Sequence, residues 1–454
     1  MLGVRESRPG VWRAAITGEQ GVVAMSKTGK GPPPKVIDHL IAVHTKNGTL
    51  DHLLHSGIGD IIAGHLHQQI GFLAGFTPAT GVEPWIYVGG TTVTLIADIN
   101  PGPAGSDPGD IMSFAVFNGD LYFGAFDPVN GYELRKVSGD DGTVSVIDIN
   151  PGPDGSNPNG FIVFNGDLYF SAFDPVNGFE PRKLSGADGT ISVIDINSAP
   201  GSAGSGAGPF VEFNGDLYFT AFDAAHGDEI WKLSGTDGTV SVIDINPGPD
   251  GSVAAHLTVF DGDLYFTVFD AVNGLFEIEK LSGADGTISQ TGFTSGVDVP
   301  GPSDFTVFNG DLYFSGFDPV NGFELIKLSG DDGTFSVIDV NAGPGDSNPR
   351  DIMEFNGDLY FTAFDPVNGN ELRKLDGVTG DITTFDFVAG SGSSDAAPLG
   401  AVNGTLAIVN PSIGRMLAAP GEPNSVSDFH IVDDGSGQFQ PTGPLFVSDG
   451  FLFA

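Results

Sequence analysis

The chain has 454 residues, of which 40% are hydrophobic and 36 are Phe, so it can bury a large core and general disorder is excluded. Its formal charge of −40 disfavours binding to nucleic acid and to anionic membranes, and it favours cations and basic partners. The absence of Cys excludes disulfides, thiolate metal sites and a Cys nucleophile.

The first 66 residues differ in charge from the rest. They carry 7 of the 18 Lys/Arg residues and 5 acidic residues, whereas residues 67–454 carry 11 basic and 53 acidic residues. We predict a non-repeat N-terminal segment at 1–66, and residues 1–24 could be a gene-model artefact because Met25 opens MSKTGKGPPPK. No secretory signal peptide is visible, and no apolar run reaches the roughly 18 residues of a spanning helix. We therefore expect no membrane insertion.

A seven-residue motif recurs after the N-terminal segment. It reads FNGDLYF or FDGDLYF and begins at Phe117, Phe164, Phe213, Phe260, Phe308 and Phe355. Successive copies lie 47 to 49 residues apart. A period of 40–50 residues built from short strands is typical of a β-propeller. We therefore predict that residues 67–454 form a propeller domain.

One copy, residues 159–206, divides into four expected strands. GFIVF is joined by the hairpin dipeptide NG to DLYFSAF, which is apolar on both faces, as expected for a strand covered on both sides. The loop DPVNG, the strand FEPRKL, the turn SGADG and the strand TISVIDI complete the unit. Gly, Pro and Asn interrupt every helical period. The prediction is an all-β fold of four-stranded antiparallel blades.

The number of blades follows from the copies. Full units start near residues 67, 117, 164, 213, 260, 308 and 355, and a degenerate unit starts near 402. We predict seven or eight blades, with eight favoured and the last one degenerate. The terminal PLFVSDGFLFA could supply a strand to the first blade, which would close the ring and remove two unpaired edges.

The copies resemble the bacterial ELWxxDGT repeat family over about residues 67–400. The tripeptide is kept best as Glu229-Ile230-Trp231 and has changed to Glu133-Leu134-Arg135 in another copy, while DGT is intact at 141–143, 188–190, 237–239, 285–287 and 332–334. The resemblance implies a propeller-like array, common in large bacterial surface or exported proteins. It implies no defined activity.

The motif FDPVNGxE, repeated four times, has two interpretations. Its Asp, Asn and Glu supply hard oxygen ligands of the kind that Ca²⁺ takes. The candidate metal ligands are Asp127, Asn130, Glu133, Asp174, Asn177, Glu180, Asp318, Asn321, Glu324, Asp365, Asn368 and Glu371. The other interpretation is structural, because Asp accepts backbone hydrogen bonds in a turn and Asn-Gly tolerates positive φ. We favour the turn and keep calcium as a possible cofactor.

The sequence presents no defined catalytic set. There is no GxSxG elbow, and the many acids do not single out a glycosidase-type pair. We therefore expect a non-catalytic binding or scaffolding propeller, extracellular or at the cell surface, which displays acidic loops to a protein or carbohydrate ligand. The alternative is a propeller-type hydrolase or lyase acting on polysaccharide, and a single active site of that kind would break the repeat symmetry at one face.

Overall fold

The computed structural model describes residues 69–109, 114–198, 204–296 and 299–449, together with four short N-terminal strands. These strands are β1 (Trp12–Thr17), β2 (Val22–Lys27), β3 (Val43–Lys46) and β4 (Thr49–His52). β1 pairs with β2, and β3 pairs with β4, both antiparallel. The rest of the predicted segment 1–66 lies outside the described residues. Within the described part of the chain, no helix is long and apolar enough to cross a membrane.

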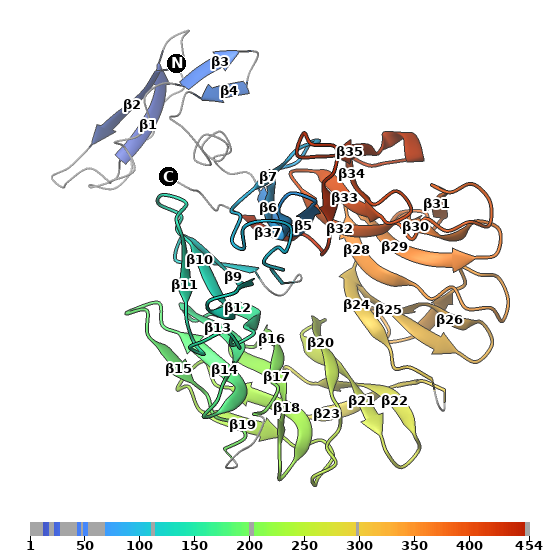
Figure 1. Cartoon of the computed structure of the whole chain (residues 1–454). Coiled ribbons are helices and arrows are strands. Elements are labelled where there is room, and N and C mark those ends of the chain that lie inside the picture. The colour runs from blue at the N-terminus through green and yellow to red at the C-terminus, as the bar shows by residue number, and fades with distance from the viewer. Residues whose placement is uncertain are drawn as a thin grey trace.

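Eight antiparallel sheets follow one another around a ring (Figure 1), which confirms the predicted propeller with eight blades. Blade 1 contains β5 (Gln69–Thr77), β6 (Gly81–Tyr87) and β7 (Val93–Leu95), and blade 2 contains β8 (Phe114–Phe117), β9 (Asp120–Asp127), β10 (Gly131–Val137) and β11 (Val144–Ile147). Blade 3 contains β12 (Asn159–Phe164), β13 (Asp167–Asp174), β14 (Gly178–Leu184) and β15 (Ile191–Val193), and blade 4 contains β16 (Gly208–Phe213), β17 (Asp216–Asp223), β18 (Gly227–Leu233) and β19 (Val240–Ile243). Blade 5 contains β20 (Ala255–Phe260), β21 (Asp263–Asp270), β22 (Leu275–Leu281) and β23 (Ile288–Thr294), and blade 6 contains β24 (Ser303–Phe308), β25 (Asp311–Asp318), β26 (Gly322–Leu328) and β27 (Phe335–Ile338). Blade 7 contains β28 (Arg350–Phe355), β29 (Asp358–Asp365), β30 (Gly369–Leu375) and β31 (Ile382–Phe385), and blade 8 contains β32 (Ala397–Val402), β33 (Thr405–Asn410), β34 (Arg415–Pro420) and β35 (His430–Val432).

Blade 3 shows why the repeat folds as four strands. Asn165 and Gly166 have φ of 50° and 81°, so the NG dipeptide forms the tight turn between β12 and β13. Leu168 and Phe170 are fully buried on one side of β13, and Tyr169 is buried on the other. The strand is therefore covered by a neighbouring blade on each side, as its sequence predicts.

The hydrophobic core is divided among the contacts between blades. Eight apolar clusters are present among the described residues, and each joins two neighbouring blades. One cluster brings Phe72 of blade 1 against Phe114 of blade 2, and another brings Trp85 of blade 1 against Met416 of blade 8. The apolar core therefore runs all the way around the ring.

The ring is closed by the C-terminal clasp, which we define as residues 433–449. The clasp follows a 3₁₀ turn, η3 (Val426–Asp428), and β35, and it contains β36 (Gln440–Pro441) and β37 (Phe446–Asp449). The backbone of Asp433 first bonds beside the outermost strand of blade 1, where its N–H donates to Thr91 O at 3.0 Å. β36 and β37 then pair with β5 on the other edge of the same blade. The prediction that the terminal segment adds a strand to the first blade is confirmed.

Connections define the two faces of the ring. The hairpin face carries the NG and SGxDG turns, and the crossover face carries the DPVNG turns and the segments that lead from one blade to the next. On the hairpin face, the amide of Asn165 donates to Gly235 O of the next blade at 3.0 Å, and Asn214 donates likewise to Gly283 O. Asn403 of blade 8 also reaches blade 1, where its side-chain amide donates to Gln69 O at 2.9 Å and to Val88 O at 3.1 Å.

Candidate functional site

The repeated Asp and Asn residues build a turn on the crossover face. Oδ1 of Asp127 accepts hydrogen bonds from the N–H groups of Val129 and Asn130 at 2.7 and 2.9 Å, and Oδ2 accepts from the Asn130 side chain at 2.8 Å. The same arrangement joins Asp174 to Asn177, Asp318 to Asn321 and Asp365 to Asn368, except that Asp318 uses Oδ1 throughout. The turn interpretation therefore accounts for every copy.

A third residue type completes this turn in some blades. Arg135 donates from its terminal amine to Asp127, and from Nε to Ala125 O at 3.3 Å. Trp231 occupies the equivalent position of blade 4, and its indole N–H donates to Ala221 O at 3.0 Å. Arg and Trp can replace each other here because each supplies an N–H to the same carbonyl. The exchange of Trp for Arg in the repeated tripeptide thus preserves one contact.

These hydrogen bonds shift the ionisation of the turn carboxylates. Burial acts to raise the pKa of Asp365, but hydrogen bonds from Asn368 and Arg373 outweigh it and lower the pKa to about 2. The pKa values of Asp127 and Asp174 are held well below the usual range by the same balance of causes. The turn is therefore built around a charged carboxylate.

A pH-dependent loss of stability follows from the lowered pKa of Asp365. Its stabilising contribution is present above the unfolded pKa of about 3.9 and is lost as the pH falls through the folded value. An Asp365→Asn variant leaves the buried Arg373 without its charged partner, and we expect it to unfold more easily by about 3 kcal/mol at neutral pH. Denaturant unfolding of both proteins should show this difference shrinking between pH 4 and pH 2. A stability difference that does not change with pH would contradict the assignment of this effect to the ionised carboxylate of Asp365.

The repeated Glu belongs to a separate network inside the blade. Glu133 is fully buried, and its carboxylate accepts hydrogen bonds from the N–H groups of Ile149 and Asn150 at 3.1 and 2.9 Å and from Ser156 Oγ at 2.5 Å. These partners lie in the segment that leaves blade 2, and Ser156 O accepts from the N–H of Phe173 in blade 3. The Glu therefore fixes the path of the crossover. Equivalent serine contacts are made by Glu83, Glu180, Glu229, Glu324 and Glu371.

The structure therefore separates the predicted metal ligands into two groups. In each copy it brings the Asp and Asn together in the turn, and it directs the Glu toward the serine and backbone amides of the crossover. Across the part of the chain that the structure describes, no three His, Cys, Asp or Glu side chains are grouped as they would be to hold a metal ion. Calcium binding by these residues stays a prediction, and their hydrogen bonds support the structural interpretation.

Blade 5 departs from this scheme. Glu279 occupies the position of Arg135 and Trp231, because it pairs with Phe266 as they pair with the corresponding Phe of their blades. Its Oε2 is buried without a hydrogen-bond partner, and burial, together with the charges of Glu277 and Glu229, raises its pKa. Blade 5 therefore contains a half-buried acid where its counterparts in blades 1, 2, 3, 4 and 7 supply an N–H donor.

Restoring the donor should stabilise blade 5. A Glu279→Arg variant removes a poorly solvated carboxylate. Its guanidinium should pair with Asp270, the counterpart of Asp127 in blade 5, as Arg135 pairs with Asp127 in blade 2. We expect the free energy of unfolding to rise by about 1–2 kcal/mol at neutral pH, measured by denaturant unfolding. Glu279→Gln, which removes the charge alone, should give a smaller gain. A destabilised Glu279→Arg protein would contradict this interpretation.

The crossover face also breaks the repeat symmetry. The inner wall formed by the first strands carries unlike residues at one position. Five residues before the turn that joins the first two strands, blades 3 to 8 have Gly160, Pro209, His256, Asp304, Asp351 and Pro398. His256, Asp304 and Asp351 have φ between 56° and 57°, and the Asp351 N–H donates to Asp304 Oδ1 at 3.1 Å. Sequence reasoning missed this set. Aligning the copies on the fifth position before each of these turns would have found it.

A hollow of about 380 Å³ lies beside Asp351 on this face, between blades 7 and 8 and the clasp. Arg350 lies between two carboxylates at its rim, 3.5 Å from Asp351 Oδ2 and 3.4 Å from Asp395 Oδ1. Pro398 and Pro441 contribute to its apolar wall. The side chain of Asp351 is 46% exposed, but desolvation by the surrounding protein and the charge of Asp304 raise its pKa, although Arg350 acts against them. The hollow thus combines apolar walls with a partly compensated acidic rim.

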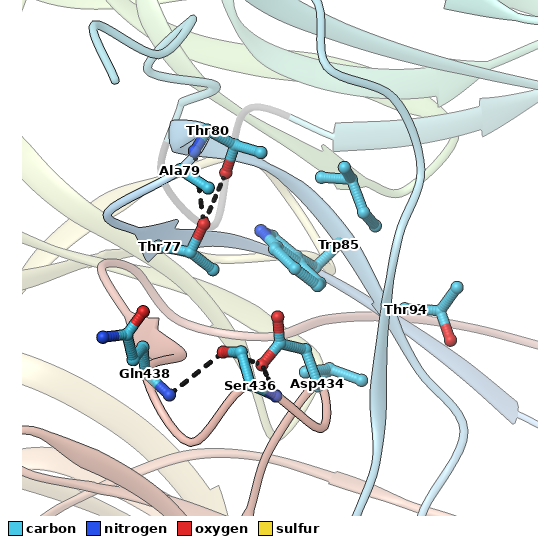
Figure 2. A pocket seen from close by; sticks show the side chains of 10 residues that line it. Thr77, Ala79, Thr80, Trp85, Thr94, Asp434, Ser436 and Gln438 are labelled. Carbon is cyan, nitrogen blue, oxygen red and sulfur yellow. Dashed lines mark hydrogen bonds between the residues drawn. The ribbon is translucent and has the colours of Figure 1, made fainter. Parts of the chain in front are cut away.

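Another hollow, of about 400 Å³, lies where the clasp crosses blade 1. In Figure 2 the indole of Trp85 lies between the hydroxyls of Thr77 and Thr80 and the clasp residues Asp434 and Gln438. Its lining contains no Lys, Arg or His side chain. This hollow is called the blade 1 pocket below.

Comparisons with known proteins add only fold-level likenesses. No protein-family model and no curated protein matches the chain. Among solved structures, it is similar to a puromycin hydrolase, with a TM-score of 0.46, 15% identity and coverage of 78% of this chain and 58% of that one. A puromycin-hydrolysing peptidase of Mycobacterium tuberculosis gives a TM-score of 0.46, 11% identity and coverage of 78% and 59%.

A third structure, AztD from Citrobacter koseri, gives a TM-score of 0.48 and 9% identity over 85% of this chain and 99% of that chain. The chain spans less than two thirds of the two puromycin-hydrolysing proteins. All three TM-scores lie below 0.5, so these likenesses carry no argument about function.

Proposed function

We propose that the protein is a non-catalytic binding or scaffolding propeller that engages a cationic protein partner on its crossover face. The observation that carries the proposal is the hollow between blades 7 and 8, where Asp351 and Asp395 stand at the rim of an apolar wall and share one cation, Arg350, between them. Such a site suits the aliphatic stem and charged end of a Lys or Arg side chain. The excess of acidic residues over residues 67–454 would draw a basic partner towards the ring.

The wider role is multivalent display at or outside the cell surface. Its support is the resemblance to the ELWxxDGT repeats together with the repeated acidic loops. Calcium as a stabilising ion belongs to the same proposal, because a strongly acidic surface favours bound cations. Because protein groups already bond the carboxylates of the FDPVNGxE residues, such ions would bind at other, exposed carboxylates.

The test is binding of a fluorescent Lys/Arg peptide, followed by polarisation, with an Asp/Glu peptide of equal length as the probe control. We expect the double variant Asp351→Asn and Asp395→Asn to bind the basic peptide at least about tenfold more weakly. A matched double variant, Asp188→Asn and Asp332→Asn, changes exposed residues on the hairpin face and should bind like the parent. Equal weakening in both variants would show that net charge alone holds the peptide, and the crossover site would be rejected.

The second candidate is a hydrolase or lyase acting on polysaccharide. It is favoured by one observation, the unlike residues His256, Asp304 and Asp351 on neighbouring blades at one face. His256 is exposed, but desolvation by the surrounding protein lowers its pKa, and the charge of Asp304 opposes that shift. An enzyme of this kind should release reducing ends or unsaturated products from a polysaccharide, and His256→Ala should abolish the release. Product formation that survives in His256→Ala would remove this set from consideration.

A further inference from the structure

A third hollow, of about 600 Å³, lies on the crossover face at blades 3 and 4. Its lining comes largely from the segments that lead into these blades, residues 157–160 and 206–209. Aligned on the turns that follow them, these segments are the counterparts of residues 348–351 and 395–398, which contribute to the hollow between blades 7 and 8. The two hollows therefore occupy equivalent places in the repeat. The third hollow is called the blade 3 pocket below.

The two equivalent hollows differ in charge. The charged residues of the hollow between blades 7 and 8 are Arg350, Asp351 and Asp395. Their counterparts in the blade 3 pocket are Asn159, Gly160 and Gly206. None of the described residues that line the blade 3 pocket is Lys, Arg, His, Asp or Glu. The blade 3 pocket therefore offers no opposite charge to an ionic ligand.

The polar side chains of the blade 3 pocket face water. Asn157 and Asn159 are both exposed, and both line the hollow. The side-chain amide of Asn159 donates one long hydrogen bond, of 3.4 Å, to Asn157 O. Because a primary amide carries two N–H donors and an acceptor oxygen, these exposed side chains can bond the polar groups of a ligand in either direction.

The apolar part of the lining comes from two half-buried aromatic residues and an exposed proline, which are Tyr132, Phe179 and Pro209. The ring of Tyr132 lies beside Gly124, where a Cβ atom would be 2.5 Å from the ring atom Cε1. Phe179 corresponds to Asn370 of blade 7, whose side chain donates to Asp395 Oδ1 at 2.5 Å. In the blade 3 pocket an aromatic ring replaces that amide and a glycine replaces that carboxylate. A polar contact is thus replaced by partly exposed apolar surface.

The lining suits a neutral ligand that has both hydroxyl groups and an apolar face. Sugar hydroxyls donate and accept hydrogen bonds, as the Asn amides do, and the C–H groups of a sugar ring pack on aromatic surface. A proline-rich peptide suits the pocket less well, because Pro has no N–H to donate to the amide oxygens. The volume of about 600 Å³ lies within the range of small-ligand sites, about 300–1,000 Å³.

We propose that the blade 3 pocket binds a neutral saccharide, with C–H groups of the sugar against Tyr132 and Phe179 and its hydroxyls bonded to the amides of Asn157 and Asn159. This inference goes beyond the proposed function, because it adds a second ligand class at a second site. It does not rest on the hollow between blades 7 and 8. The crossover face would hold a cationic partner at one part of the ring and a saccharide at another.

The experiment titrates a panel of neutral mono-, di- and oligosaccharides into the full chain and follows binding by calorimetry. We expect at least one saccharide to bind, and the double variant Asn157→Gly and Asn159→Ala to bind it at least about tenfold more weakly. Gly is chosen at position 157 because the backbone there has φ of 50°, which Gly adopts without strain. The matched control is Asn348→Gly, an exposed residue with φ of 46° at the equivalent point before blade 7, and it should bind like the parent. Thermal unfolding verifies that each variant is folded.

Any of four results would overturn the inference. These are no saccharide binding at about 10 mM, unchanged binding in the double variant, equal weakening in the control, or tighter binding of a neutral oligoproline peptide than of any saccharide. The basic peptide used above is measured on the same preparations. Binding of the basic peptide without saccharide binding would reject the blade 3 pocket alone. Saccharide binding without binding of the basic peptide would reject the hollow between blades 7 and 8 alone.

Discussion

Replacing Phe439 by Ala is expected to lower the free energy of unfolding by about 3–5 kcal/mol. Phe439 is fully buried, packs against Trp85 and belongs to the cluster that joins blade 8 to blade 1. Removing its ring leaves a cavity at the closure of the propeller, where the clasp passes from one edge of blade 1 to the other. Denaturant unfolding measures the change. Hydrogen exchange should also show faster exchange in β5, which pairs with the clasp.

The matched control is Phe364→Ala, the same chemical change at a side chain that is 38% exposed. It should cost clearly less than Phe439→Ala, because more than a third of its surface stays in water whereas Phe439 is fully buried. If the two variants lose similar stability, or if exchange in β5 stays unchanged in Phe439→Ala, the clasp is not what holds the ring closed.

Glu133→Ala is expected to have the second largest effect, a loss of about 3 kcal/mol or more. The substitution deprives the N–H groups of Ile149 and Asn150 and the hydroxyl of Ser156 of a buried acceptor. Because Ser156 and Asn150 are buried as well, water does not readily replace the carboxylate. Denaturant unfolding should show the loss, and exchange should become faster at the amides of Ile149 and Asn150.

Asp141→Ala provides the control within the same blade. Asp141 also accepts hydrogen bonds from a serine/threonine-type turn, through the N–H and hydroxyl of Thr143, but it is exposed on the hairpin face. Its substitution should change stability little. A Glu133→Ala protein as stable as the parent would show that the crossover does not depend on the buried Glu.

Much of the fold could be predicted because its determinants are local. The NG turns, the doubly apolar second strands and the spacing of the copies each act within one blade, so four strands could be drawn for residues 159–206 before the structure was known. The terminal strand was predictable as well, because a ring of sheets requires its two ends to pair. The eighth blade was recognisable only by the remnant NG at Asn403, since its other motifs have changed.

The candidate sites could be predicted only in part because they depend on contacts between distant residues. Glu133 and Ser156 are 23 positions apart, and nothing in the spacing of FDPVNGxE shows that its Glu faces the crossover and not the turn. The blade 1 pocket joins Thr77 to Gln438, which only ring closure brings together. The sequence signal that could have indicated these sites was a departure from the repeat. Trp85, Glu279 and His256 each stand where most other copies have a different residue type.

The most direct test of the central claim, that the repeated acids build the blades, is thermal unfolding in millimolar Ca²⁺, in Mg²⁺ and in excess chelator. Since the carboxylates of Asp127 and Glu133 are already bonded by protein groups, we expect no Ca²⁺-specific change in the unfolding midpoint from these residues. A rise in Ca²⁺ alone would show preferential binding to the folded ring. If that rise were lost when Glu133, Glu180, Glu324 and Glu371 are changed to Gln, the ions would lie at the repeated loop, and the structural account of FDPVNGxE would be contradicted.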